Sequence, residues 1–348
     1  MRIINEVKLD FNDVLICPKR SAIDSRSQVN LIRTFETLNS NRTITGIPII
    51  AANLDTVATF NMAKALSEFK IFTALHKFYK PTELIKFISN YYEYTFYTMG
   101  VSDEDIHKLC SSNNGNINKI CIDIANGYTE FFVKKVREIR NMFPEAIIMA
   151  GNVATPEMVQ ELLIVGGVDI VKIGIGPGQV CKTREMTGVG YYQLSAIMEC
   201  ADVAHGLGGH ICADGGCINP GDICKSFGAG ADFTMLGTML SGHDECDGEW
   251  EYENEIVSNN LNIPVLTGKK TKKRIKLYGM SSREAMEKYY GGVADYRASE
   301  GKCIWVPYKG PVKNTVQEIL GGLRSCCSYV GATELKDLSK CTTFIRNK

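Results

Sequence analysis

One cysteine in a glycine-rich segment is the residue of this chain best suited to covalent chemistry. The segment GIGPGQVCKTREMTGVG covers residues 174–190 and contains Cys181, with Thr183 two positions further on. Clustered glycines permit unusual backbone angles and a close approach to a ligand. Cys181 could be another small core residue, as most of the 13 cysteines are expected to be. A thiol in a glycine loop has no core to join, so we expect Cys181 to be a nucleophile.

Two later segments could bind a phosphate and a sugar. Asp214-Gly215-Gly216 and Gly237-Thr238 each follow a short apolar run. Backbone N–H groups in such loops can point at an anion, and a carboxylate such as Asp214 can accept two hydrogen bonds from ribose hydroxyls. Either segment alone could be an ordinary turn. Together they favour recognition of a phosphorylated sugar.

A dinucleotide cofactor would not be bound here as in a Rossmann fold. No G-x-G-x-x-G follows a predicted strand and opens a helix. The segment DIANG at residues 123–127, which includes Asp123, Ile124 and Ala125, is the candidate wall for a pyridine cofactor. A metal centre is not expected, because the chain has neither C-x-x-C nor H-E-x-x-H.

The elements that must position these residues follow a regular pattern. After about residue 47, short β-branched runs alternate with longer amphipathic ones, which is typical of βαβ units. The predicted strands are Pro48–Asn53, Ile71–Leu75, Tyr94–Met99, Lys119–Ile124, Ile147–Gly151, Asp169–Ile175, His210–Asp214 and Asp232–Gly237. The predicted helices include Asn61–Phe69, Tyr128–Met142 and Pro156–Val165. Eight strands, each followed by a helix, predict an α/β TIM (β/α)₈ barrel, with a doubly wound open sheet as the alternative.

The chain is expected to form a single catalytic domain over residues 1–348. Residues 1–46 are too irregular for a barrel unit and should form an extended arm or hairpin that covers the barrel floor or reaches a neighbour. Residues 241–278 are polar and contain no clear helix, so we expect a mobile flap, within a flap region spanning 241–300. Its position after the eighth strand places it beside the active-site end of a barrel.

Composition narrows the possible partners. Lysines and arginines number 39 and balance 39 acids, so no bulk charge favours nucleic acid or an anionic membrane. The basic cluster at 269–274 is interpreted as a solvated loop. No apolar stretch approaches a membrane span and no secretory leader is evident, so the thiols are expected to be reduced in a cytoplasmic protein.

Ten segments of the chain resemble the IMP dehydrogenase/GMP reductase family. They are DFNDVLICPKR (10–20), AANLDTV (51–57), MAGNVAT (149–155), KIGIGPGQVCKTR (172–184), GVGYYQLSA (188–196), ADGGC (213–217), GADFTMLGTMLSG (230–242), YGMSS (278–282), YRASEGK (296–302) and VPYKG (306–310). The resemblance runs over nearly the whole chain, and the cysteine segment is highly specific. It implies a TIM barrel, in agreement with the strand count.

Three features favour the reductase branch of that family. Only 45 residues separate Lys77 from Asp123, which leaves no room for the CBS-type regulatory insertion of the dehydrogenases. The Arg-Tyr dipeptide with which dehydrogenases activate water is absent from the chain. DIANGY (123–128) and YRASEGK resemble the reductase versions of these segments. The alternatives are a dehydrogenase without its regulatory module and a catalytically silent nucleotide-binding barrel.

The resemblance implies reduction of GMP to IMP and ammonia with NADPH, through a covalent adduct between Cys181 and purine C2. A departing amine must be protonated, and the family assigns this proton to Glu300 acting through Thr183. The implied substrate-binding residues are Asp214, Gly215, Gly216, Gly237, Thr238, Gly279, Met280, Ser281, Arg297, Ser299 and Gly301. The implied cofactor-binding residues are Lys77, Asp123, Ile124, Ala125, Tyr296 and, from a neighbouring subunit of a homotetramer, Ser25 and Arg26. A potassium ion would bind at Gly176, Gly178 and Cys181, with Arg184 nearby.

The chain departs from the family pattern at three places. Lys182 stands where a threonine is usual and adds a positive charge beside the nucleophile. Thr238 replaces the second glycine of a common pair and could crowd the phosphate. The flap insertion around 247–273 is longer than expected for this branch.

Overall fold

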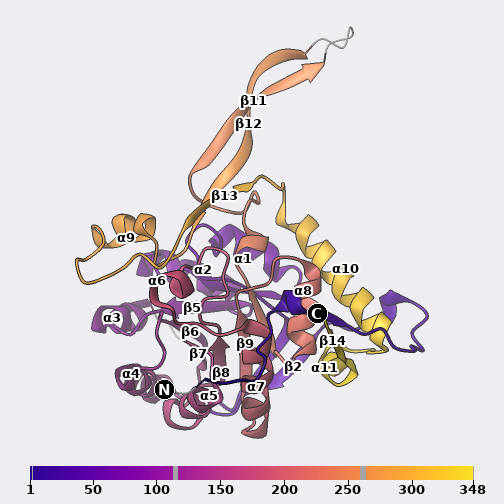
Figure 1. Cartoon of the computed structure of the whole chain (residues 1–348). Coiled ribbons are helices and arrows are strands. Elements are labelled where there is room, and N and C mark those ends of the chain that lie inside the picture. Colours follow the sequence, from indigo (N-terminus) through magenta and orange to yellow (C-terminus); the bar gives the residue numbers. More distant parts are fainter. Residues whose placement is uncertain (2, 113–116, 259–263, 348) are drawn as a thin grey trace.

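Eight parallel strands close into a barrel. The computed structural model describes residues 1, 3–112, 117–258 and 264–347. Each barrel strand pairs with its neighbours in chain order, and the last strand pairs with the first to close the ring (Figure 1). The strands are β3 (Thr43–Ala51), β4 (Ile71–Leu75), β5 (Thr95–Met99), β6 (Lys119–Asp123), β7 (Ile147–Val153), β8 (Ile170–Ile173), β9 (His210–Asp214) and β10 (Phe233–Leu236). This confirms the predicted TIM barrel, and the open-sheet alternative is wrong.

Helices between the strands form the outer layer. They are α1 (Phe60–Ser67), α2 (Pro81–Tyr91), α3 (Asp103–Ser112), α4 (Glu130–Met142), α5 (Pro156–Glu161), α7 (Gln193–Gly206), α8 (Pro220–Gly228) and α10 (Val312–Val330). Thr59 and Thr129 begin α1 and α4, because each side chain accepts a backbone hydrogen bond from the first helical turn. The predicted α5 helix begins at Pro156 as expected, and it continues as a π-helical turn over Leu162–Gly166.

Alternation along each strand divides the barrel into an inner and an outer core. In β9, Cys212 packs inside the barrel with Phe72 and Phe233, whereas Ile211 and Ala213 pack against the helices. The same period of two places Ile170 of β8 inside the barrel and Val171 and Ile173 outside. Lys172 is therefore directed inward, at the end of the barrel where the strands terminate.

The N-terminal residues cover the barrel floor. Strand β2 (Arg33–Glu36) pairs antiparallel with the start of β3, and Phe35 lies 4.5 Å from the ring of Phe233 inside the barrel. Asp169 accepts hydrogen bonds from the backbone N–H groups of Asn39 and Ser40, which holds the turn of this hairpin. This hairpin therefore covers one end of the barrel. Strand β1 (Val14–Ile16) pairs instead with the C-terminal strand β14 (Phe344–Arg346).

The region after β10 contains strands that were not predicted from the sequence. Strands β11 (Trp250–Ser258) and β12 (Pro264–Tyr278) form an antiparallel hairpin that projects from the barrel, and β13 (Cys303–Pro307) adds a third strand (Figure 1). The basic cluster at 269–274 is part of β12. Arg274 lies 2.6 Å from Glu251 across the hairpin, so charged pairs replace the apolar alternation that would have revealed these strands.

Three observations concern membrane spans, disulfides and metal clusters. Among the described residues, no helix is long and apolar enough to cross a membrane. All 13 cysteines are free thiols. Within the same part of the chain, no three His, Cys, Asp or Glu side chains gather as a metal site would require.

Candidate active site

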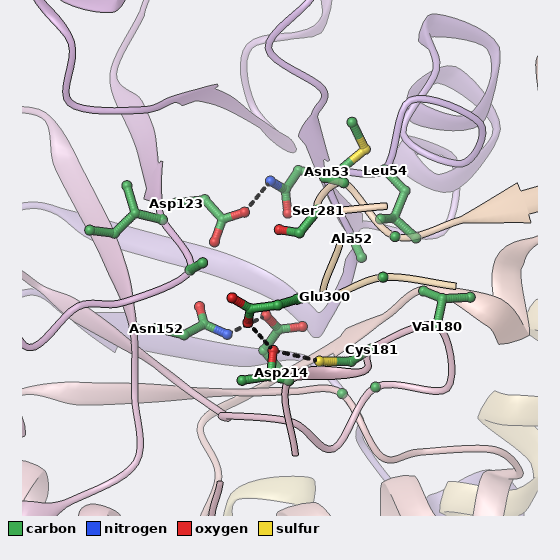
Figure 2. Close-up of a pocket in the computed structure, with 18 of the residues that line it drawn as sticks. Ala52, Asn53, Leu54, Asp123, Asn152, Val180, Cys181, Asp214, Ser281 and Glu300 are labelled. Carbon is green, nitrogen blue, oxygen red and sulfur yellow. Dashed lines mark hydrogen bonds between the residues drawn. The ribbon is translucent and has the colours of Figure 1, made fainter. Parts of the chain in front are cut away.

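A cavity of about 810 Å³ opens at the C-terminal ends of the barrel strands. The loops after the strands form its floor and walls, and the segment 279–301 forms the opposite side (Figure 2). Most of the predicted site residues line it. They are Lys77, Asp123, Ile124, Ala125, Gly176, Gly178, Cys181, Thr183, Asp214, Gly215, Gly216, Gly237, Thr238, Gly279, Met280, Ser281, Tyr296, Arg297, Glu300 and Gly301.

A chain of hydrogen bonds links Cys181 to a carboxylate. The Cys181 thiol lies 3.3 Å from the Thr183 hydroxyl, and that hydroxyl donates to Glu300 Oε2 at 2.7 Å (Figure 2). Cys181 follows β8, and Thr183 begins the short helix α6 (Thr183–Thr187). Glu300 comes from the far side of the cavity, 117 positions beyond Thr183. The arrangement can move a proton between the sulfur and the carboxylate.

The cysteine loop and the Glu300 segment are paired by their backbones. Lys182 N donates to Glu300 O at 2.6 Å, and Lys302 N donates to Val180 O at 2.9 Å. A side chain on Gly301 would have its Cβ 2.7 Å from Ser282 N, so only glycine permits this approach. The pairing fixes the Glu300 carboxylate relative to the thiol.

The floor of the cavity is a polar network around a buried lysine. Lys172 Nζ lies 2.6 Å from Asp214 Oδ2 and 3.1 Å from Asp123 Oδ1. Asn152 also donates to Asp214 Oδ2, at 2.9 Å, and Asn53 donates to Asp123 Oδ2 at 2.7 Å (Figure 2). Burial would lower the pKa of Lys172, but the two carboxylates outweigh it and raise that pKa well above its usual value. The lysine is therefore charged.

The Lys77 side of the cavity combines a cation with aromatic rings. Lys77 Nζ lies 5.7 Å from the ring centre of Phe78 and 5.8 Å from that of Tyr290. Burial lowers the pKa of Lys77, but Asp105, 4.0 Å away, and Tyr290 outweigh this effect and raise it. A charged amine beside aromatic faces suits an anionic ligand that also carries a ring.

A buried carboxylate anchors the segment that closes the cavity. Asp55, in the loop after β3, accepts hydrogen bonds on Oδ2 from Tyr278, Lys288 and Tyr289 at 2.7, 2.8 and 2.6 Å. Lys288 and Tyr289 lie on α9 (Arg283–Tyr290), and Tyr278 ends β12. Burial raises the pKa of Asp55, but its three donors outweigh this effect and lower it.

Four predicted site residues lie outside the cavity lining. Ser25 and Arg26, beside the 3₁₀ turn Arg26–Gln28, do not line the cavity of their own chain. Ser299 donates its hydroxyl to Gly301 O at 3.3 Å. The Arg184 side chain packs behind Gly176 and pairs with Asp10 at 3.4 Å.

The three departures from the family pattern lie in different surroundings. Lys182 is half-buried and contacts Glu300 through its backbone. Thr238 lines the cavity and begins a 3₁₀ turn, Thr238–Leu240. The insertion around 247–273 overlaps the β11–β12 hairpin; its residues 259–263 lie outside the described residues.

Sequence reasoning missed Lys172, Asn152, Asn53 and Asp55. Site residues of a barrel are expected in the loops that follow its strands, whereas Lys172 and Asn152 lie within β8 and β7. The sequence did contain a signal, because Lys172 stands between Val171 and Ile173 in a strand whose other residues are all apolar. A lysine at an inward position of a parallel strand must have a buried partner. Asp55 offered no comparable signal, since its partners lie more than 220 positions away.

The fold and the site together define a (β/α)₈-barrel enzyme with a cysteine hydrogen-bonded through a threonine to a glutamate at the C-terminal end of the barrel. The chain belongs to the IMP dehydrogenase/GMP reductase family, since the family profile described as "IMP dehydrogenase / GMP reductase domain" matches residues 8–348.

Similar proteins carry reductase names. The chain is 55% identical to a GMP reductase of Phytophthora infestans, over 99% of this chain and 92% of that protein. It is 54% identical to GMP reductase 2 of Homo sapiens, over 98% and 95% of the two chains. It is also 54% identical to human GMP reductase 1, over 99% and 96%.

Proposed function

We propose that this protein catalyses the reductive deamination of GMP to IMP and ammonia with NADPH. The relatives named GMP reductase, which align over nearly their whole length, support the reaction. The observation that carries the mechanism is the relay from Cys181 through Thr183 to Glu300. It provides the nucleophile and the acid that this deamination needs, side by side.

The relay has two tasks in the proposed mechanism. The Cys181 sulfur adds to purine C2, and its proton can pass through Thr183 to the Glu300 carboxylate. The same proton then returns through Thr183 to the amino group, which leaves C2 as ammonia because a protonated amine is a good leaving group. A hydride supplied to C2 would then let Cys181 leave as the thiolate, which regains its proton from solvent, and IMP would be released.

The nucleotide is proposed to lie across the floor of the cavity. Asp214 would accept the ribose hydroxyls, and Gly215, Gly216, Gly237 and Thr238 would present backbone N–H groups to the phosphate. Asn152 and Lys172 hold only Oδ2 of Asp214, which leaves Oδ1 for a ligand. The remaining proposed substrate contacts come from the closing segment, at Gly279, Met280, Ser281, Arg297, Ser299 and Gly301.

NADPH is proposed to occupy the Lys77 side of the same cavity. Its chemistry when bound is the donation of a hydride. The volume of about 810 Å³ accommodates a purine nucleotide together with a second ring, which fits both ligands. Lys77, Asp123, Ile124, Ala125 and Tyr296 all line this volume and would hold the cofactor.

A monovalent cation would fit the cysteine loop. The carbonyls of Gly176, Gly178 and Cys181 are neutral oxygen ligands of the kind that potassium prefers, and Arg184 packs behind Gly176. The Gly178 carbonyl already accepts one hydrogen bond from Cys181 N, at 3.0 Å, which leaves its second lone pair. We propose potassium at this loop.

Ser25 and Arg26 are proposed to complete the cofactor site of a neighbouring subunit in a homotetramer. Their position outside their own cavity supports this assignment. Light scattering should then give a tetramer, and Arg26→Ala should raise the KM for NADPH without changing the KM for GMP.

The free thiols support a reducing, cytoplasmic location.

The reaction is tested by absorbance at 340 nm. NADPH absorbance should fall when GMP is added, with IMP and ammonia formed in equal amounts. Growth of NADH absorbance with IMP and NAD would instead indicate a dehydrogenase. Cys181→Ala should bind GMP and form no product. Cys303→Ala, at a half-buried thiol outside the cavity, is the matched control and should keep full activity.

A further inference from the structure

We propose that Lys172 is a positioning residue that keeps Asp214 and Asp123 ionised and correctly placed, and so links the nucleotide half of the site to the cofactor half. This inference rests on the proposed function for the identity of the ligands. It concerns a lysine to which the mechanism above assigns no task.

Lys172 is buried where the two halves of the site meet. Its side chain is 2% exposed, and its amine contacts one carboxylate from β9, Asp214, and one from β6, Asp123. β8, which carries Lys172, pairs with β9 on one side and with β7 on the other. The side chain therefore crosses the barrel end above β7 to reach β6.

The Lys172 amine supplies the positive charge that balances both carboxylates. The other titratable groups that face Lys172 are the thiols of Cys121 and Cys212. Burial raises the pKa of Cys121 to about 12 and that of Cys212 well above its usual value, so both are neutral. Two carboxylates thus share one ammonium. Without it they would face each other uncompensated, and the pKa of one of them would rise.

The contacts with Lys172 matter for GMP binding because they help to hold each carboxylate in a fixed orientation. Asn53 holds the second oxygen of Asp123, and Asn152 holds the Asp214 oxygen that also contacts Lys172. A protonated Asp214 would accept hydroxyl hydrogen bonds less well than the carboxylate does. Loss of the lysine should therefore weaken GMP binding, and more strongly as the pH falls.

The first test is calorimetric binding of GMP between pH 6 and pH 8. The GMP phosphate itself titrates near pH 6, so each variant is compared with the wild type at the same pH. Lys172→Met should raise the Kd by about thirty-fold over the wild type, the size expected when one partner of a buried charge pair is removed, and by a larger factor at pH 6. Lys172→Arg should recover part of the affinity and keep a constant ratio to the wild-type Kd at every pH. A Kd for Lys172→Met within two-fold of the wild type at every pH would overturn the proposal.

A double variant separates this role from a merely structural one. In Lys172→Met with Asp123→Asn, only Asp214 keeps a charge at the floor, so the like-charge repulsion and the added pH dependence of the GMP Kd should both disappear. This variant also serves if Lys172→Met alone fails to fold. A ratio of this variant's Kd to the wild-type Kd that still rises as the pH falls would contradict the proposed electrostatic cause.

Thermal unfolding without any ligand gives a readout that does not depend on GMP. A carboxylate whose pKa is raised in the folded state binds an extra proton there, so stability rises as the pH falls towards the unfolded value near 4. The Tm deficit of Lys172→Met should therefore shrink between pH 8 and pH 5, and the double variant should lack this trend. A constant deficit would overturn the proposal even if GMP proved not to be the substrate.

Lys119→Met is the matched control for a buried lysine. Lys119 begins β6 at the other end of the barrel, where its amine donates to Tyr92 O and Asn118 Oδ1. Its loss should lower the Tm and leave the GMP Kd unchanged. An equal loss of GMP affinity in this variant would show that Lys172 acts only through stability.

Discussion

Glu300 reaches the thiol only through the Thr183 hydroxyl, so its contribution should be a proton and not binding affinity. Glu300→Gln keeps a similar shape and cannot supply that proton. We expect kcat to fall by roughly 10²- to 10⁴-fold, the usual contribution of general acid–base catalysis, with little change in the KM for GMP. Steady-state assays at 340 nm measure both constants.

Glu287→Gln is the control at this scale, because Glu287 is exposed on α9 and does not line the cavity. It should leave both constants unchanged. A kcat for Glu300→Gln within three-fold of the wild type would contradict the relay. Thr183→Val should resemble Glu300→Gln, since the hydroxyl connects the two groups.

Residues adjacent to the nucleophile could be predicted from the sequence, because they stand in one loop. Cys181 and Thr183 are two positions apart and lie together in the cavity. The position of Glu300 came only from resemblance, since it lies 117 positions beyond Thr183 along the chain. Lys172 was not predicted because its partners end two other strands, and only strand alternation indicates that it is directed inward.

At the scale of elements, the anchor at Asp55 holds α9 and the end of β12 against the barrel. Asp55→Asn would remove the charge that Lys288 and two tyrosines share. We expect the KM for GMP to rise several-fold, because Met280 and Ser281 follow directly from the anchored Tyr278. Lys288→Met should produce a smaller effect in the same direction, since the lysine is half exposed. An unchanged KM in both variants would show that the anchor does not position the closing segment.

The same anchor should be insensitive to pH in the physiological range. The pKa of Asp55 is lowered in the folded protein, so its stabilising contribution is present above the unfolded value of about 3.9 and is lost only as the pH falls through the lower folded value. Hydrogen exchange of α9 amides, corrected for intrinsic rates, should therefore give constant protection between pH 5 and pH 8. Weaker protection already at pH 6 would contradict a depressed pKa.

The barrel strands could be predicted from the local sequence, whereas the strands of the projecting hairpin could not. Strands β4 and β9 were predicted with their observed bounds, because both faces of a barrel strand are buried and the apolar run is continuous. The hairpin of β11 and β12 was missed because polar and charged residues stand at successive positions of its exposed part, such as Glu253 and Asn254 in β11 and Lys270 and Thr271 in β12. Its cross-strand pairs, such as Lys273 with Glu251 at 3.2 Å, become visible only once the register is known.

At the scale of the whole molecule, the cavity and a buried ion pair lie at opposite ends of the barrel. The barrel floor, at the end opposite the cavity, is held by the ion pair of Arg140 and Asp169. The two side chains lie 2.6 Å apart, and Asp169 is not exposed. Arg140 also donates to the carbonyls of Gly167 and Ala146, and Asp169 holds the β2–β3 turn. This network joins the N-terminal hairpin to β8 at the end far from the cavity.

Arg140→Met should therefore lower stability without affecting the reaction. It leaves the Asp169 carboxylate buried and unpaired, which costs about 3–5 kcal/mol when one partner of a buried ion pair is removed. Urea unfolding at 25 °C should show the lower midpoint, while kcat and both KM values stay within two-fold of the wild type. A fall in kcat without a shift of the urea midpoint would indicate that the floor communicates with the active site, and that the two ends of the barrel are not independent.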